Sequence, residues 1–322
     1  MEWVNFLGTN LAQLAGYLTD ANKRLFWAYL LGALLLTLPL YLRQRQGGKS
    51  WWQLLFPAAV YRHRSVRHDV ALLLLNKLLK AALFAPLLLT MVPVALATTE
   101  LLEGLFGAPL HLGWSPWWVM TAFTLLLFVL DDFSRFLLHL LLHKIPLLWD
   151  YHKVHHSAPV LTPLTIYRSH PLESYLYACR MALSQGIAVG LGYFLFGTSL
   201  QVHEILGANV LVFVFNLLGS NLRHSHLWLS WGQWLEGWFI SPAQHQLHHS
   251  SDPAHRDCNL GSALAIWDRA YGSLIKAHQA QPDTLQFGCG AAAGHDSVRG
   301  LYLQPLKDNA LRLRRKWPAA TR

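Results

Sequence analysis

Three groups of closely spaced histidines are the residues of this sequence whose types and spacing could support chemistry. Two groups share the pattern H-x2-HH, and the other contains two histidines four residues apart. The groups are His139 and His143; His152, His155 and His156; and His245, His248 and His249. Offsets of three and four residues place side chains on one face of a helix. Each group therefore presents neighbouring imidazoles, which are common ligands of first-row transition metals.

Short helices are predicted for the last two groups. Pro146 ends the helix before the first of them, because proline lacks an N–H and clashes with the preceding turn. Pro159 closes that segment soon after its histidines. Ser241 is a suitable N-cap, and Pro242 a suitable first helical residue, for the segment of the other group.

His224 adds a ninth histidine, because it directly follows the last predicted apolar span. Nine imidazoles exceed the roughly four to six ligands of a single ion, so the set indicates two metal ions. Water, hydroxide or an oxo group would then bridge them. Solvated histidine faces are the alternative, which is disfavoured because helical triplets rarely repeat by chance in so apolar a chain.

Further residues are candidates to assist this centre. His170 and His226 could be extra ligands or could support the ligands from behind. The carboxylates that could fix the imidazole tautomers are Asp131, Asp132, Asp150 and Glu173. Helix-end charges or surface salt bridges are equally good interpretations of each carboxylate alone. Isolated histidines are expected at the surface or in the core: His63, His68, His111, His203, His255, His278 and His295.

The composition favours a membrane protein. Of the 322 residues 53% are hydrophobic and 13% are charged, against about 25% charged in soluble domains. The net charge is +9, and its basic residues gather in residues 43–67 and in the C-terminal tail. Because these patches flank apolar spans, anionic lipid headgroups are favoured over nucleic acid as their partner. The three cysteines are isolated, which argues against disulfides or thiolate metal sites.

Five apolar stretches predict an all-α integral membrane protein, with about four to five membrane-spanning or re-entrant helices. They cover residues 26–42, 70–97, 117–130, 175–196 and 200–218. The third is expected to continue as a helix beyond the membrane, and the last two to form a hairpin. No cleaved signal is predicted, so the first stretch is expected to remain as an anchor.

The distribution of basic residues predicts the orientation. Residues 43–69 are rich in arginine, whereas residues 98–116 contain no lysine or arginine, which places the first loop in the cytoplasm. Threaded forward, this topology brings every histidine group to the cytoplasmic side, in a helical cap that holds the dimetal site. A bacterial inner membrane is the expected location.

The motifs resemble those of the membrane-bound fatty acid hydroxylase and sterol desaturase superfamily. The resemblance is carried by the histidine boxes, by His170, Pro171 and Glu173, and by NLGSALAIWDRAYGSL at residues 259–274. It covers about residues 120–275 and implies a di-iron oxygenase in which the eight box histidines and His224 bind Fe²⁺. His226 would be a tenth ligand, or Ser220 would mark a lost one. Zinc stays possible, because imidazole sites bind it tightly.

The resemblance divides the chain into N-terminal membrane helices (1–119), a catalytic domain (120–275) and a basic, loosely structured tail (276–322). It implies hydroxylation of a membrane lipid with O₂ and electrons from a separate donor protein, because the chain contains no ferredoxin or dinucleotide-binding motif. Desaturation and ether-lipid cleavage are the alternatives with the same chemistry. The substrates considered are fatty acyl, sterol-like, hopanoid, ornithine and glycerol ether lipids. The oligomeric state is not predicted.

Two alternatives belong to other classes of protein. A membrane zinc hydrolase would need a carboxylate base beside an open metal position, as in H-E-x-x-H, and the sequence contains no such motif. A metal-binding transport protein would place its ligands in the middle of spans, whereas these histidines lie at the ends and beyond.

Overall fold

The computed structural model describes residues 2–44, 48, 50–84, 87–198, 200–290 and 293–316. The described chain is mostly helical, as predicted. Its N-terminal part contains α1 (Glu2–Ala15), α2 (Trp27–Gln44), α3 (Trp51–Leu55), α4 (Ala58–Tyr61) and α5 (Arg64–Leu79), which continues as the π-helical turn η3 (Lys80–Phe84). The central part contains α6 (Met91–Phe106), α7 (Pro116–Lys144), α8 (Pro146–His156), η5 (Pro163–Tyr167) and α9 (Pro171–Phe196).

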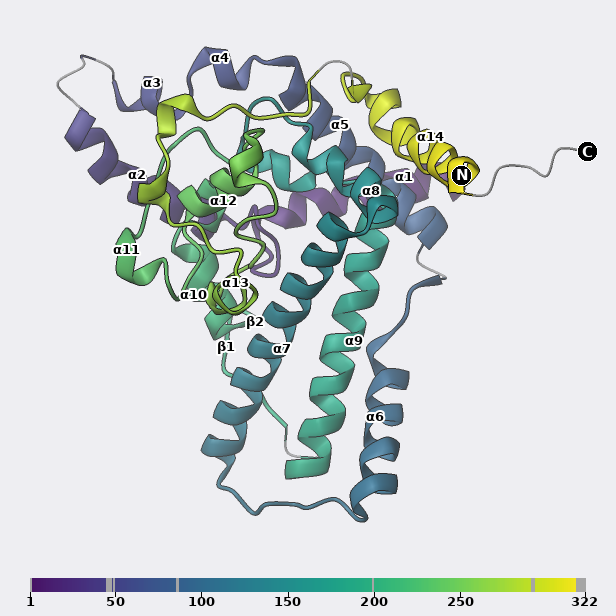
Figure 1. Cartoon of the computed structure of the whole chain (residues 1–322). Helices are drawn as coiled ribbons and strands as arrows, with labels where there is room; N and C mark the ends of the chain where they lie inside the picture. Colours follow the sequence, from purple (N-terminus) through teal and green to yellow (C-terminus); the bar gives the residue numbers. More distant parts are fainter. Residues whose placement is uncertain are drawn as a thin grey trace, which may run out of the picture.

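The C-terminal part begins with a short antiparallel pair, β1 (Glu204–Ile205) and β2 (Ala208–Asn209). The helices after it include α10 (Val210–Leu217), η6 (Ser220–Arg223), α11 (Gly232–Leu235), α12 (Pro242–His248), α13 (Ile266–Tyr271) and α14 (Val298–Lys316). Most of these are short and are joined by loops around the end of α7, so they form a cap at that end (Figure 1).

Helices α6, α7 and α9 run side by side and project from the cap (Figure 1). Glycines permit the close contact of α6 with α9: a Cβ added at Gly186 would lie 2.5 Å from the Cβ of Val94. Small residues of this kind are typical where membrane helices pack together. In the described chain one helix, α9, has the length and apolar composition to cross a membrane, and Trp27–Leu42 is a shorter apolar helix.

Helix α7 confirms that the third apolar stretch continues as a helix past residue 130. The prediction of one span over residues 70–97 is wrong. Helix α5 ends at Leu79 and α6 begins at Met91, and residues 85–86 lie outside the described chain. Helix α5 belongs to the cap because it buries polar side chains, Asp69 and Asn76 among them, against cap residues.

The prediction of a span over residues 200–218 is also wrong. Leu206 and Gly207 have φ values of 50° and 77°, and they form the turn between β1 and β2. Asn209 then caps α10, because its side chain accepts a hydrogen bond from the backbone N–H of Leu211. The apolar stretch is thus interrupted by a turn, and the helix that remains has eight residues.

The prediction of a loosely structured tail is wrong for residues 298–316, which form α14. Leu301 packs with Leu72 of α5 and Val154 of α8. Asp150 of α8 also pairs with Arg312 at 2.6 Å. The apolar pattern of this helix is weak, because residues 301, 305 and 309, which share the buried face, are Leu, Pro and Asn. Residues 317–322, with the basic Arg322, lie outside the described chain.

Candidate metal centre

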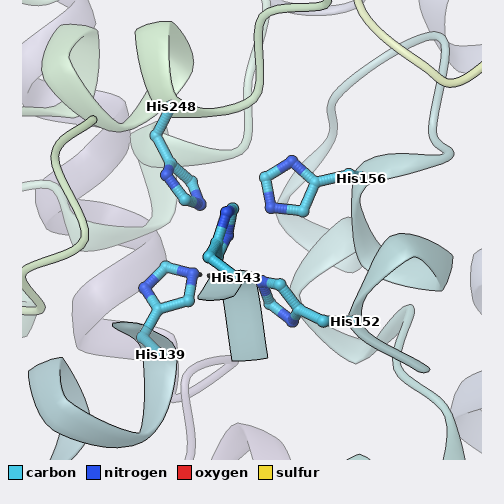
Figure 2. Close-up of side chains that lie close together, drawn as sticks. All are labelled: His139, His143, His152, His156 and His248. Atoms are coloured by element: carbon cyan, nitrogen blue, oxygen red, sulfur yellow. Dashed lines mark hydrogen bonds between the residues drawn. The ribbon is translucent and has the colours of Figure 1, made fainter. Parts of the chain in front are cut away.

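Nine histidines converge beside the end of α7 in two groups. The five-histidine group comprises His139, His143, His152, His156 and His248, and the four-histidine group comprises His155, His224, His245 and His249. Within each group, one ring nitrogen of every residue lies within 4.8 Å of the others. Figure 2 shows the five rings of the first group around a shared space, carried by α7, α8 and α12. The structure thus brings together all nine histidines that the sequence predicted as ligands.

Helical geometry pairs two of the three histidines in each H-x2-HH box. Residues four apart differ by about 40° around a helix axis, and residues three apart by about 60° in the opposite direction. In the first H-x2-HH box, His152 and His156 share the five-histidine group, and His155 joins the other. In the second box the pair four apart joins the four-histidine group, and His248 joins the five-histidine group. Each box therefore reaches both groups.

The helix ends hold these boxes in place. Helix α12 begins with a capping box in which Ser241 and Gln244 bond each other's backbone N–H, and Pro242 follows the cap. Helix α8 likewise begins with Pro146. The two groups adjoin, because the rings of His156 and His249 stack with their centroids 4.5 Å apart.

Hydrogen bonds fix the protons on two facing imidazoles of the five-histidine group. Nδ1 of His139 lies 2.7 Å from the carbonyl oxygen of Leu260, and Nδ1 of His152 lies 2.8 Å from Oε1 of Glu173. The Leu260 carbonyl oxygen only accepts, so Nδ1 of His139 carries the proton; the ionised form of Glu173 likewise only accepts, which places the proton of His152 on Nδ1 and leaves each Nε2 with a lone pair. The two Nε2 atoms are 3.0 Å apart. Two lone pairs therefore face each other with no proton between them.

This arrangement fits a metal cation. Two nitrogens bound at right angles to one ion, each at about 2.1 Å, would lie about 3.0 Å apart. In the described chain the buried Nε2 atoms of His143, His156 and His248 have no hydrogen-bond partner. A cation bound among these lone pairs would satisfy all five nitrogens, and imidazole suits divalent first-row metals.

The four-histidine group is built in the same way around His224. Its Nε2 lies 3.1 Å from the Nε2 atoms of His155, His245 and His249. Nδ1 of His155 faces the carbonyl oxygen of Arg168 at 3.2 Å, so the Nε2 of His155 presents a lone pair. Burial lowers the pKa of His155 to about 4, and burial with neighbouring imidazoles lowers the pKa of His224 well below its usual value. These histidines are thus neutral at pH 7, the form that binds metals.

A short loop, residues 257–260, supports three imidazoles of the five-histidine group; it is called the acceptor loop below. Asp257 and Asn259 have φ values of 57° and 50°, a left-handed conformation that costs energy in residues other than glycine. This backbone turns three oxygens toward the rings. The contacts are Asp257 to His143 at 3.0 Å, Cys258 to His248 at 2.8 Å and Leu260 to His139 at 2.7 Å. The histidine motifs do not predict these contacts, although residues 259–274 carry part of the family resemblance.

Of the four predicted carboxylates, Glu173 is hydrogen-bonded to one of the nine histidines, His152. The prediction is wrong for Asp131, Asp132 and Asp150. Asp131 pairs with Arg135 and Arg180, and Asp150 pairs with Arg312, so both are salt-bridged as in the alternative interpretation. Asp132 acts at one remove, since its carboxylate accepts hydrogen bonds from the segment that follows the acceptor loop. Its donors are the backbone N–H groups of Ala263 and Leu264 and the indole N–H of Trp267.

His170 and His226 lie outside both groups, so the structure does not support a ligand role for either. His170 is the N-cap of α9: its Nδ1 accepts from the backbone N–H of Leu172, and its Nε2 faces the carbonyl oxygen of Tyr302. The Nε2 of His226 faces the carbonyl oxygen of Leu54 at 2.8 Å. The isolated histidines also lie outside the two groups, as expected.

Replacing Glu173 by leucine should weaken metal binding at the five-histidine group by about 10- to 100-fold, because the Nδ1–H of His152 would lose its acceptor. Glu173→Gln keeps an acceptor oxygen in nearly the same volume and should lose less. Competition with a chromophoric chelator measures the metal affinity of both variants. Equal affinities for wild type and Glu173→Leu would show that this hydrogen bond does not support the centre.

Two cavities adjoin the centre, and each is lined by different histidines. The helix-side cavity, of about 270 Å³, is lined by residues of α7, α9, η3 and η6 and reaches His139, His152, His155, His224 and His245. The loop-side cavity, of about 830 Å³, is lined by residues 250–253 and 286–290 and reaches the remaining four, His143, His156, His248 and His249. Each of the nine imidazoles therefore lines one of the two cavities.

Fold and site together define a helical protein with a histidine-rich centre that is suited to two metal ions. Residues 123–273 match the family model described as fatty acid hydroxylase. The resemblance drawn from the histidine motifs is therefore confirmed for this part of the chain. No solved structure matches the chain.

Curated relatives agree with this family. An ornithine lipid hydroxylase of Rhizobium tropici is 29% identical over 161 residues, which are 50% of this chain and 44% of the relative. An alkylglycerol monooxygenase of Xenopus tropicalis is 28% identical over 171 residues, 52% of this chain and 32% of the relative. A Delta(7)-sterol 5(6)-desaturase of Gibberella zeae is 30% identical over 162 residues, 50% of this chain and 43% of the relative.

All three relatives are oxidoreductases by name, which is the enzyme class predicted from the sequence for this chain. The chain spans less than half the length of each of them. Its own reaction and substrate are therefore matters for proposal.

Proposed function

We propose that this protein is a membrane-bound di-iron oxygenase that inserts oxygen into a C–H bond of a lipid. The observation that carries the proposal is the pair of histidine groups. Within each group, one ring nitrogen of every histidine lies within 4.8 Å of those of the others. Iron is proposed from the family match and from the imidazole ligands, which suit iron as well as zinc. Bound iron would supply the activation of O₂ that an unactivated C–H bond requires.

The residues of the chain prepare the site for this chemistry. Nine neutral imidazoles would hold the ions, and Glu173 and the acceptor loop orient four of the five rings of the larger group. The helix-side cavity would hold the lipid against His139, His155 and His224. The loop-side cavity would give access to O₂ and place the centre near a separate electron-donor protein.

The exposed surface of α6, α7 and α9 supports a membrane location. Large apolar side chains are exposed along the projecting helices: Val92, Leu96, Leu101 and Leu105 on α6, Leu125 and Val129 on α7, and Met181, Leu183 and Ile187 on α9. Contiguous apolar surface of this kind is unfavourable in water. Embedded in lipid, these helices would place the cap and its centre at the membrane face, and the arginine-rich loop indicates the cytoplasmic face.

Mass spectrometry of cell lipids tests the function. Cells that express wild type with iron, oxygen and an active electron donor should contain a lipid that is one oxygen heavier, and cells that express His248→Ala should not. His255→Ala is the matched control, since His255 lies outside both groups. A lipid two hydrogens lighter would replace hydroxylation by desaturation. Identical lipids in wild-type and His248→Ala cells would overturn the oxygenase proposal.

A further inference from the structure

The helix-side cavity is strongly basic. Among the described residues, four cationic side chains line it, namely Arg24, Lys80, Arg135 and Arg223, and Glu173 is the one acidic side chain. Glu173 is engaged by His152, and Arg135 is paired with Asp131 at 2.7 Å. In the described chain Arg24 and Arg223 have no carboxylate within 4.0 Å. The cavity therefore holds two arginines whose charges lack a close counter-ion.

The two arginines are held near each other by the protein. Their guanidinium carbons lie 5.8 Å (Arg24) and 4.7 Å (Arg223) from the ring centroid of Phe215, so both cover the same ring. Arg24 donates to Oδ1 of Asn216 at 2.7 Å, and Arg223 donates to the carbonyl oxygen of Ile240 at 2.9 Å. A guanidinium has five N–H donors, so each keeps further donors for a ligand in the cavity.

The energetics favour an anion beside these side chains. Arg223 is buried and Arg24 is half-buried, so both guanidiniums lose part of their hydration beside a like charge. Asp132 and Asp268 attract Arg223 from a distance, but backbone N–H groups already occupy both carboxylates. Buried charges without a partner are costly. A carboxylate or phosphate between the arginines would relieve their repulsion and accept paired hydrogen bonds.

We propose that Arg24 and Arg223 form a recognition site for the anionic headgroup, carboxylate or phosphate, of the lipid that the protein oxidises; this inference rests on the function proposed above. The cavity also reaches His155, His224 and His245 of the four-histidine group. At about 270 Å³ it is smaller than pockets that enclose drug-sized ligands, about 300–1,000 Å³. The oxidised C–H bond therefore lies near the headgroup and not far along an acyl tail.

A second basic cavity supplies a route to this site. It has a volume of about 610 Å³ and shares Lys80, Ile166, Ser169 and Ser174 with the helix-side cavity. Lys23 and Lys77 also line it, and no aspartate or glutamate in the described chain does. Anionic headgroups would be attracted along this path toward the arginines.

Binding measurements without O₂ or reductant test the site. The full-length, metal-loaded protein in a neutral detergent is titrated by calorimetry with dodecyl phosphate, dodecanoate, 1-O-dodecylglycerol and inorganic phosphate. Wild type should bind the two anionic amphiphiles at least about tenfold more tightly than the neutral one. Arg24→Gln and Arg223→Gln should each remove at least about tenfold of that affinity. Lys307→Gln, at an exposed site on α14, should remove none.

Lysine variants and folding controls complete the test. Arg24→Lys and Arg223→Lys retain the charge without the planar fork, so they should lose less affinity than the glutamine variants. Unchanged metal content and melting temperature show that each variant is folded. Equal affinity for anionic and neutral amphiphiles, or equal affinity of wild type and the folded glutamine variants, would overturn the proposal. Inorganic phosphate that binds as tightly as dodecyl phosphate would overturn a lipid ligand. Because these experiments measure binding and not turnover, their outcome can be interpreted even if the protein is not an oxygenase.

Discussion

His248→Ala is expected to empty one half of the metal centre. Its Nε2 is buried with no hydrogen-bond partner in the described chain, and the carbonyl oxygen of Cys258 holds its Nδ1 at 2.8 Å. The ring therefore presents a lone pair to the five-histidine group. Metal analysis of the purified protein should show a fall from about two ions per chain toward one. Lipid oxidation should fall more than about 100-fold, because loss of a ligand exceeds the 10- to 100-fold effect of losing a ligand's own support.

The control for this experiment is His226→Ala. His226 follows the four-histidine group's His224 by two residues, yet it lies outside both groups and faces the carbonyl oxygen of Leu54. Its replacement should leave the metal content at the wild-type value. Equal metal content in His248→Ala and wild type would remove His248 from the centre, and loss of metal in His226→Ala would restore the tenth ligand considered from the sequence.

The convergence of the nine histidines could be predicted because the spacing within each box places imidazoles on one face of a helix. An imidazole face at offsets of three and four requires only that a short helix forms, and proline and serine mark the start of α12. Helical geometry pairs the two histidines that lie four apart in each box, but the group that each pair joins could not be predicted, because it depends on where α8 and α12 lie relative to each other. The contacts of the acceptor loop could not be predicted for a similar reason, since two of its three acceptors are backbone carbonyls. Any residue type supplies a carbonyl, so the sequence carries no signal for it.

The predictions of spans over residues 70–97 and 200–218 are wrong because these apolar stretches contain residues that form polar contacts or a turn. The stretch at residues 70–97 contains many leucines. However, Asn76 within it and Asp69 just before it are buried in contact with cap residues. Hydropathy averages over these residues, whereas the fold depends on each buried polar group finding its partner. In the same way Gly207, at a φ of 77°, supplies a turn inside an otherwise apolar stretch.

Asp69→Ala is expected to cause a large loss of stability. Asp69 and Arg168 are buried with relative exposures of 0% and 1%, and their side chains pair at 2.9 Å. Removing the carboxylate leaves a buried guanidinium without its counter-ion, which costs about 3–5 kcal/mol. Thermal unfolding of the full chain in a neutral detergent should show a large fall in melting temperature. Asp20→Ala is the control, because its pair with Lys23 is exposed and weak, about 0–1 kcal/mol.

The same substitution should affect the two halves of the centre unequally. Besides binding Asp69, the Arg168 guanidinium donates to the carbonyl oxygen of Val154 and to Ser157, so it ties η5 to α8. The Arg168 carbonyl supports His155 of the four-histidine group, whereas the acceptor loop and Glu173 support the five-histidine group. Below its melting temperature, Asp69→Ala should therefore lose metal first from the four-histidine group. A variant that melts at the wild-type temperature and keeps both ions would show that the ion pair neither stabilises the cap nor positions His155.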